Sequence, residues 1–171
     1  PVFTDGATLA VDFAENSTAT VTTLAATDND EGDTVTYTLK DELDADSFNL
    51  ADGVLTFKEA PDFETKSSYS ITAVASDGVN EASQVITVTI TNVNEAPVFE
   101  SGPSAAFNVA EGNRSVGILL ATDADAGDIV SYTLEGADAG SFDLVAGVLT
   151  FKEAPDFETK SSYSITAVAS D

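Results

Sequence analysis

The sequence predicts an all-β protein of two tandem seven-stranded, Greek-key, immunoglobulin-like β-sandwiches, the second lacking its last strand. Residues 55–77 (LTFKEAPDFETKSSYSITAVASD) recur without change as residues 149–171, so the chain contains an internal repeat. Apolar and polar residues alternate with period two between breaks at Gly, Asn and Asp, a pattern typical of short strands at sandwich spacing. Helical periodicity is absent, which leaves strands as the regular elements to expect.

The repeat sets the domain organisation. Pro1-Val2-Phe3 reappears as Pro97-Val98-Phe99, and at 171 residues the chain is long enough for two small domains. We therefore expect a first domain at residues 1–96, a linker at 92–97 and a second domain at 97–171. Residues 78–92 have no counterpart in the second copy, so either the chain is a piece of a longer array or the second domain lacks its last strand.

Seven strands are expected in the first copy, at residues 9–14, 20–26, 34–39, 47–50, 54–58, 68–76 and 84–91. This count is typical of immunoglobulin-like sandwiches. Asp52-Gly53 predicts a tight turn between the fourth and fifth strands. The second copy repeats the first through its sixth strand.

Two apolar rows of the predicted strands run directly into acidic residues. Residues two apart in a strand share a face, so the row that ends in Phe13 continues into Glu15, and the row that ends in Ala75 continues into Asp77. An acid that continues a core row must lie at an end of the sandwich, where water or a metal ion can satisfy it. In an antiparallel sandwich, Glu15 and Asp77 lie at opposite ends if one of their strands leads away from the joint and the other leads toward it. The same arrangement recurs in the second copy at Glu111 and Asp171.

Composition limits the possible functions. Thirty acidic residues against six basic ones give a net charge of −24, which makes nucleic acid and anionic lipid poor partners. The chain has no Cys and no His, so disulfides, thiolate or imidazole metal sites and Ser-His-Asp chemistry are excluded. Membrane insertion is not expected, because no segment approaches eighteen apolar residues. A folded acidic protein needs counterions, and carboxylate oxygens select Ca²⁺ or Mg²⁺, although saline surroundings would explain part of the charge equally well.

Two acidic motifs occur in both copies. Residues 28–33 and 123–128 share the spacing D-x-D-x-G-D. They are not EF-hand loops, because the twelfth positions hold Leu39 and Leu134 rather than Glu, and such a motif alone is as readily a solvated loop. The sequence Pro-Asp-Phe-Glu at residues 61–64 and 155–158 places two acids on one side of an extended chain. A glycosidase pair is disfavoured there, because both copies carry the same acids and the chain has no sugar-stacking Trp.

Five motifs in order resemble the cadherin repeat, in the form found in large bacterial surface proteins. They are Ala14-Glu15-Asn16, Ala26-Thr27-Asp28-Asn29-Asp30, Pro61-Asp62-Phe63-Glu64, Ala73-Val74-Ala75-Ser76-Asp77 and Asn92-Val93-Asn94-Glu95-Ala96-Pro97. The resemblance implies cadherin-type sandwiches with three Ca²⁺ ions at the joint between them. The linker departs from the family pattern, because Asn92 replaces an Asp and one residue is missing before Pro97, so we expect two or three ions.

The resemblance also implies which residues hold calcium. The ligands at the joint would be Glu15, Asp62 and Glu64 of the first domain, Asn94 and Glu95 of the linker, and Asp123, Asp125 and Asp171 of the second domain. Half-sites toward neighbouring repeats would be Asp28, Asp30 and Asp77 at one end, and Glu111, Asp156 and Glu158 at the other.

The leading functional hypothesis is a non-catalytic, calcium-binding structural or adhesive module of a larger extracellular or cell-surface repeat protein that mediates cell adhesion. Its partners would be adjacent repeats of the same chain, with homophilic or polysaccharide contacts. Repulsion among the acids at the joint predicts that calcium locks the two domains into a rod. The alternative is a carbohydrate-binding module of a polysaccharide-associated protein, for which Phe63 and Phe157 are the candidate exposed aromatic residues.

Overall fold

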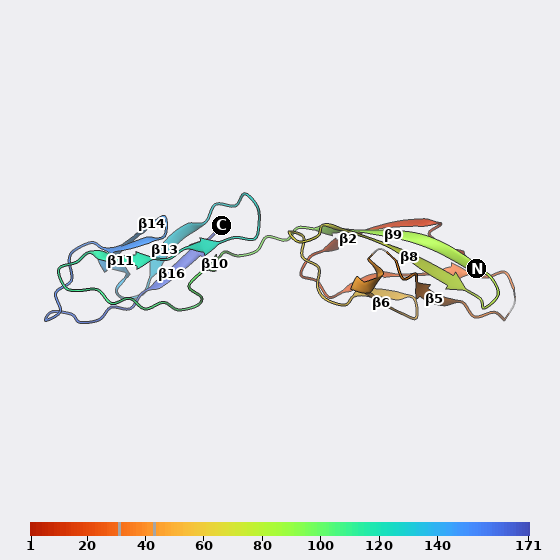
Figure 1. Cartoon of the computed structure of the whole chain (residues 1–171), viewed down its shortest axis with the longest axis horizontal. Coiled ribbons are helices and arrows are strands. Elements are labelled where there is room, and N and C mark those ends of the chain that lie inside the picture. The colour runs from red at the N-terminus through yellow and green to blue at the C-terminus, as the bar shows by residue number, and fades with distance from the viewer. Residues whose placement is uncertain (31, 43) are drawn as a thin grey trace. The chain divides into compact units, whose positions relative to one another are not determined.

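The computed structural model describes residues 1–30, 32–42 and 44–171 and divides the chain into two compact units. The first is Pro1–Val93 and the second Asn94–Asp171, so the division falls a few residues before the predicted boundary at 96/97 (Figure 1). Both units are built from strands. The helical elements in the described part of the chain are two 3₁₀ turns, η1 (Ala45–Ser47) and η2 (Ala139–Ser141). Within that part, no helix has the length and apolar character needed to cross a membrane.

The first unit has a four-stranded and a three-stranded sheet. The larger sheet has the order β2-β9-β8-β5, with β2 at Thr8–Ala14, β9 at Glu81–Thr91, β8 at Ser68–Ser76 and β5 at Thr36–Leu39. The smaller has the order β3-β7-β6, with β3 at Thr20–Thr23, β7 at Val54–Phe57 and β6 at Phe48–Ala51. Two short strands, β1 (Val2–Phe3) and β4 (Ala26–Thr27), pair with each other. The all-β prediction is confirmed.

The core of the first unit consists of the apolar rows that the alternation predicts. Ile71 and Ile86 face each other across β8 and β9, and both are fully buried with Leu55 of β7. Phe48 and Phe57 add an aromatic pair with ring centroids 4.3 Å apart. Every second residue of β9 from Gln84 onward is buried, because that strand lies between two neighbours and turns one face to the core.

The directions of β2 and β8 decide where Glu15 and Asp77, the two acids that follow core rows, lie in the first unit. β8 and β9 are antiparallel, whereas β2 and β9 are parallel. It follows that β2 and β8 run in opposite directions. Glu15, just after β2, and Asp77, just after β8, therefore lie at opposite ends of the first unit.

The second unit has the same plan with smaller sheets. Its strands are β10 (Val98–Phe99), β11 (Ser115–Ile118), β12 (Ala121–Thr122), β13 (Ser131–Glu135), β14 (Phe142–Val145), β15 (Val148–Phe151) and β16 (Thr166–Ser170). They pair as β10-β12, β11-β15-β14 and β13-β16. The fully buried apolar core is correspondingly small and consists of Leu119, Phe142, Leu149 and Phe151.

Identical sequence gives unequal strands in the two units. β8 covers the nine residues Ser68–Ser76, whereas β16 covers only the five residues Thr166–Ser170, although residues 68–76 and 162–170 are the same. In the first unit, residues 68–71 have their ladder pairing with β9, while β5 pairs only with residues 73–76. The second unit has no counterpart of β9 in the described residues, so residues 162–165 lose the partner that makes them a strand.

Candidate metal sites at the ends of the two units

Glu15 is a buried carboxylate at the end of β2. Its side chain is 3% exposed and accepts two backbone hydrogen bonds of 2.8 Å, from the N–H of Phe63 and from the N–H of Val93. A carboxylate that replaces its hydration by such charge-assisted bonds can be buried without losing its charge. Glu15 thus ties the Pro-Asp-Phe-Glu loop to the last residue of the first unit.

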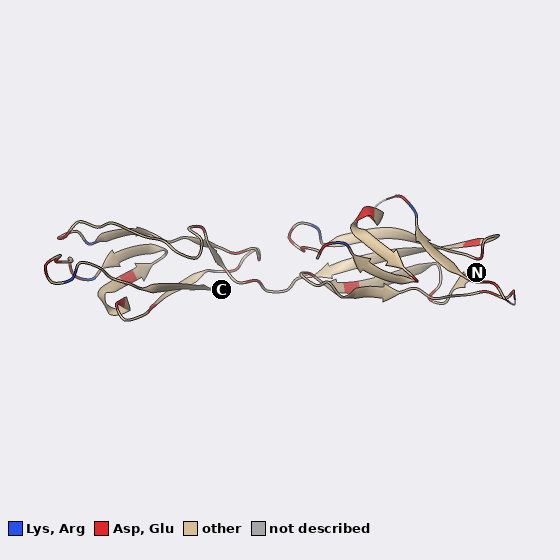
Figure 2. Cartoon of the chain, turned by 90° about the horizontal axis from the view of Figure 1, so that it is seen from below, with Lys and Arg blue, Asp and Glu red and all other residues tan. Residues whose placement is uncertain are grey.

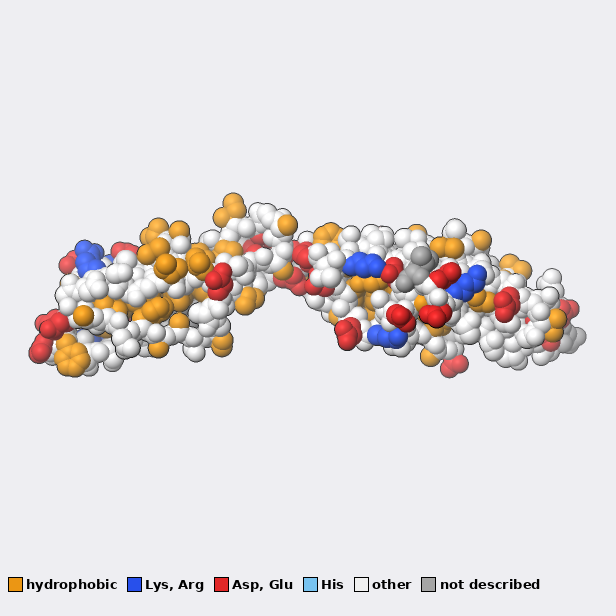
Figure 3. Space-filling model, in the orientation of Figure 1, with side chains coloured by type: hydrophobic (Ala, Val, Ile, Leu, Met, Phe, Trp, Pro, Cys, Tyr) orange, Lys and Arg blue, Asp and Glu red, His pale blue; other side chains and the backbone are white. Residues whose placement is uncertain are grey.

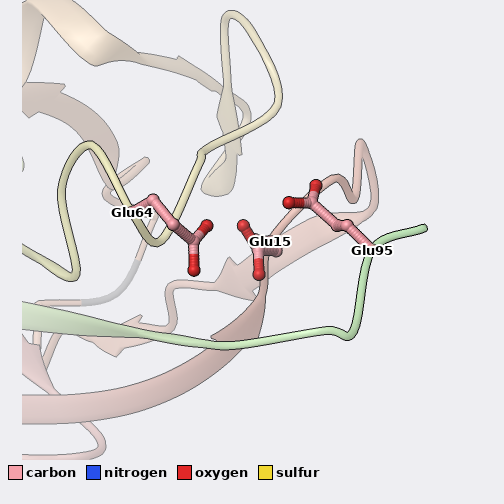
Figure 4. Close-up of side chains that lie close together, drawn as sticks. All are labelled: Glu15, Glu64 and Glu95. Carbon is pink, nitrogen blue, oxygen red and sulfur yellow. The ribbon is translucent and has the colours of Figure 1, made fainter. Parts of the chain in front are cut away.

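A second carboxylate of the same loop comes close to Glu15. Glu15 and Glu64 each offer an oxygen within 4.8 Å of the other, and Figure 4 shows the two carboxylates turned toward one another. Glu95, also labelled there, follows the unit boundary and belongs to the second unit. Asp62 is outside this group, and its two oxygens accept bonds from the backbone N–H and hydroxyl of Thr65, at 2.8 and 3.0 Å. Glu15 and Glu64 are thus the carboxylate pair at this end of the first unit.

The second unit gathers three aspartates of its D-x-D-x-G-D loop. Oxygens of Asp123, Asp125 and Asp128 lie within 4.8 Å of one another. Asp125 is 7% exposed and accepts a 2.7 Å bond from the backbone N–H of Glu95, and its own N–H donates to Asp123 Oδ1 at 3.0 Å. The other oxygen, Asp123 Oδ2, is buried and has no hydrogen-bond partner in the described structure. A buried anionic oxygen without a donor calls for a cation.

The aspartates of the same loop lie close enough to repel one another. Loss of hydration raises the pKa of Asp128, and the charges of Asp125, Asp123 and Asp171 raise it further. Asn94 donates a 2.5 Å hydrogen bond from Nδ2 to Asp171 Oδ2 and so draws the start of this unit toward its last acid. This end of the second unit therefore holds four neighbouring carboxylates.

The opposite end of the first unit holds Asp28, Asp33 and Asp77, which also offer oxygens within 4.8 Å of one another. The backbone N–H of Asp30 donates a 2.9 Å hydrogen bond to Asp28 Oδ1. Hydrogen bonds from the backbone N–H groups of Asn80 and Val79 lower the pKa of Asp77. Asp30, a predicted ligand, is outside the group, and Glu31 of the same motif lies outside the described residues.

The opposite end of the second unit brings together Glu111, Asp156 and Glu158, all of them exposed. Glu111 accepts a 3.3 Å bond from the N–H of Phe157, the weaker counterpart of the bond that Glu15 accepts from Phe63. The Thr159 hydroxyl is the largest cause that lowers the pKa of Asp156. Phe157 itself is 64% exposed, whereas Phe63 packs against the first core.

Sequence reasoning missed Asp33 and Asp128. Each is the last acid of D-x-D-x-G-D, and each joins the cluster at its end of a unit. The equal spacing in both copies was the available signal. The positive φ of Gly32 and Gly127 turns the loop back, which carries the last acid toward the first two.

The four clusters fit a hard divalent cation. They supply carboxylate oxygens, which suit Ca²⁺ or Mg²⁺, and the chain has no Cys or His to favour a softer metal. Many of the acids lie on loops and turns, as the red segments of Figure 2 show. Loops at strand ends can adjust to the six to eight oxygen ligands that Ca²⁺ takes.

The fold of the two units and the clusters of acids at their ends together define a class of protein, a tandem of cadherin-type β-sandwiches. No protein-family profile matches the sequence. The chain is 35% identical over its whole length to protocadherin Fat 4 of Mus musculus, and 35% identical over 70% of its length to cadherin-4 of Caenorhabditis elegans. It spans only 4% and 3% of these proteins.

Solved structures agree with this assignment. Mouse cadherin-23 EC22-24 superposes with a TM-score of 0.62 at 26% identity, over 98% of this chain and 59% of that one. Human protocadherin-24 EC1-2 superposes with a TM-score of 0.66 over 98% of this chain and 93% of that one; at 20% identity it shows the fold alone. The chain therefore consists of cadherin-like repeats.

Proposed function

We propose that this chain is a calcium-binding structural and adhesive module whose two repeats are stiffened by Ca²⁺ at the linker. The observation that carries the proposal is the buried, unpartnered Asp123 Oδ2 in the cluster with Asp125 and Asp128. An anionic oxygen without a donor, next to carboxylates that repel one another, is stabilised by a divalent cation.

The residues that would hold the ions come from the two ends that flank the linker. They are Glu15, Asp62 and Glu64 of the first unit, and Asn94, Glu95, Asp123, Asp125 and Asp171 of the second, to which the structure adds Asp128 as a candidate. Two or three Ca²⁺ ions would offset four or six of the eight negative charges of these acids. Without the ions, the same charges repel and the linker is free to bend.

Small-angle scattering of the chain in Ca²⁺ and in chelator tests this function. We expect a longer maximum dimension in Ca²⁺ and a broader, more compact ensemble in chelator. The Asp123→Asn variant should need more Ca²⁺ for the same change. Equal profiles in both buffers would overturn the proposal.

The wider role follows from the relatives. A short piece related to long cadherins and protocadherins supports a place in an extracellular or cell-surface array. In that setting the half-sites Asp28, Asp30 and Asp77, and Glu111, Asp156 and Glu158, would bind calcium jointly with adjacent repeats. Adhesion by homophilic contacts and the absence of catalysis are parts of the same proposal. A bacterial source stays a prediction, because the relatives compared are animal proteins.

Polysaccharide binding is not part of the proposal. The first candidate aromatic residue, Phe63, packs against the core. The second, Phe157, lines a cavity of the second unit rather than a flat platform.

A further inference from the structure

Each unit contains a lysine that is paired with an aspartate 22 residues before it. In the first unit, the Lys66 ammonium forms an ion pair with Asp44 and lies 4.6 Å from the ring centroid of Tyr69. A cation over an aromatic face gains an attraction beyond that of the ion pair. Asp44 also accepts a 2.9 Å hydrogen bond from the backbone N–H of Ser70, near the start of β8. Asp44 and Tyr69 therefore hold Lys66 against β8.

The same arrangement recurs in the second unit. Lys160 forms an ion pair with Asp138, and its ammonium lies 4.8 Å from the ring centroid of Tyr163. The loops that supply the two aspartates are otherwise different, since residues 41–47 read DELDADS and residues 135–141 read EGADAGS. The lysine–aspartate pair is thus present in both units although the other acids of the loop are not.

Lys66 ends the acidic loop that carries Asp62 and Glu64. Its backbone N–H donates a 2.9 Å hydrogen bond to the carbonyl of Asp62, so the loop closes into a turn at this point. The loop is also fixed before Glu64, because the N–H of Phe63 donates a 2.8 Å bond to Glu15. Glu64 therefore lies between two anchored positions, and its carboxylate is presented beside that of Glu15.

The charge of this lysine makes its position informative. The basic residues of the first unit are Lys40, Lys58 and Lys66. Figure 3 shows basic side chains, in blue, among acidic side chains, in red, on the visible face of this unit. A lysine two residues from Glu64 repels any cation that binds there. Pairing with Asp44 offsets this repulsion, so a lysine can order the loop at little cost to cation binding.

We propose that the Lys66–Asp44 pair positions the acidic loop of the first unit so that Glu64 can bind Ca²⁺. The Lys160–Asp138 pair has the same role for the acidic loop of the second unit. The inference rests on the proposed function, because it needs Ca²⁺ to bind at these acids. Neither lysine binds the ion. Each holds its loop in the binding shape before the ion arrives, and the apparent affinity is lowered when this shape is only fractionally populated.

Hydrogen exchange in chelator tests the positioning without a metal. The Lys66→Gln substitution removes the ion pair, so the amides of residues 65 and 66, which bond to Asp62, should exchange about tenfold faster than in the native chain. Lys58→Gln is the matched control, because it removes the same charge from an exposed lysine outside the pair, and it should leave exchange unchanged. Unchanged exchange in Lys66→Gln would overturn the proposal.

A calcium titration of the whole chain, followed by NMR at the Phe63 and Val93 amides, tests the consequence for binding. Both amides bond to Glu15 and so report on this end of the first unit. Loss of a positive charge by itself tightens the binding of a cation, and this is the result expected for Lys58→Gln. Lys66→Gln should instead weaken binding by about threefold or more, because its loop adopts the binding shape for a smaller fraction of the time.

The outcomes separate this inference from the proposed function. Lys66→Arg keeps a cation that can pair with Asp44 and lie over Tyr69, so it should bind Ca²⁺ within about twofold of the native chain. Binding by Lys66→Gln that equals or exceeds that of the native chain would overturn the inference alone. A native chain whose Phe63 and Val93 amides do not respond to Ca²⁺ would overturn the proposed function, and this inference with it.

Discussion

The backbone N–H of Val93 donates a 2.8 Å hydrogen bond to the Glu15 carboxylate, which fixes the last residue of the first unit to the end of β2. The other Glu15 oxygen accepts from Phe63, so one buried side chain holds three separate segments together. Because Glu15 is also close to Glu64, the same carboxylate has a structural role and offers a metal ligand.

Replacing Glu15 should destabilise the first unit. Glu15→Ala leaves two backbone N–H groups without their acceptor, which costs about 3 kcal/mol in unfolding free energy. Urea denaturation in chelator measures this without a metal contribution. Glu111→Ala is the matched control in the second unit: its acid is exposed and accepts a single 3.3 Å bond, so we expect a loss below about 1 kcal/mol. Equal losses would contradict the structural role of Glu15.

Removing the charge of Asp128 should stabilise the second unit in chelator. Its pKa is raised from the ordinary value of 3.8, so the folded state binds more protons than the unfolded state just above that value. Stability therefore falls as pH rises from about 3.8 through the raised pKa and stays lower at neutral pH. Asp128→Asn should abolish this fall and raise the melting temperature at neutral pH in chelator. An unchanged pH profile would show that the acids do not repel.

Asp44 and Asp138 should show the opposite pH dependence. Burial opposes the ionisation of Asp44, but hydrogen bonds from the Lys66 ammonium and the Ser70 N–H outweigh this effect and lower the pKa of Asp44. Hydrogen bonds from the Lys160 ammonium and the Ser164 N–H lower the pKa of Asp138. Their stabilisation is present above 3.8 and is lost as pH falls through the lowered pKa values.

The substitution Asp44→Asn should cost about 1 kcal/mol at neutral pH, since Lys66 is 42% exposed and solvent weakens the ion pair. Asp138→Asn should likewise lower the melting temperature of the second unit at neutral pH. Thermal melts of both variants from pH 2 to 7 check whether each substitution lowers stability at neutral pH and has less effect at low pH. A gain in stability from either variant at neutral pH would contradict it.

Calcium affinity should depend on Asp123. Asp123→Asn removes one charge from the cluster that contains the unpartnered oxygen, so we expect about tenfold weaker binding, roughly 1.4 kcal/mol, by calorimetry. Asp12→Asn is the matched control, because it makes the same charge change on an exposed strand position outside every cluster. An equal loss in both variants would mean that net charge, rather than this site, attracts the ion.

Much of the first unit could be predicted from the sequence, because period-two alternation reports directly on a sheet with one buried face. The range 68–76 was predicted to the residue, and Glu15 lies at a sandwich end as its row indicates. The strand β1 was missed because two-residue strands have no periodicity, and the single strand predicted at 20–26 is divided into β3 and β4. The parallel pairing of β2 with β9 was missed because alternation does not encode strand direction.

The site was harder to predict than the fold. Both D-x-D-x-G-D loops were recognised, but Asp33 and Asp128 were left out because their approach to the other acids depends on a glycine in the left-handed region. Asp62 and Asp30 were named as ligands from their motifs, and both lie outside the clusters of oxygens within 4.8 Å of one another, so their place as ligands stays a prediction. The shortening of β16 shows the limit of local sequence: the same nine residues need a partner strand to form one.

The exact identity of residues 55–77 and 149–171 also bears on how the molecule folds. During refolding, β9 meets two chemically equal edges, one in its own unit and one about ninety residues further along the chain. Loop closure favours the nearer edge only modestly, since its entropic cost grows slowly with chain length. We therefore expect the far pairing to compete with the native one during refolding, as a kinetic trap.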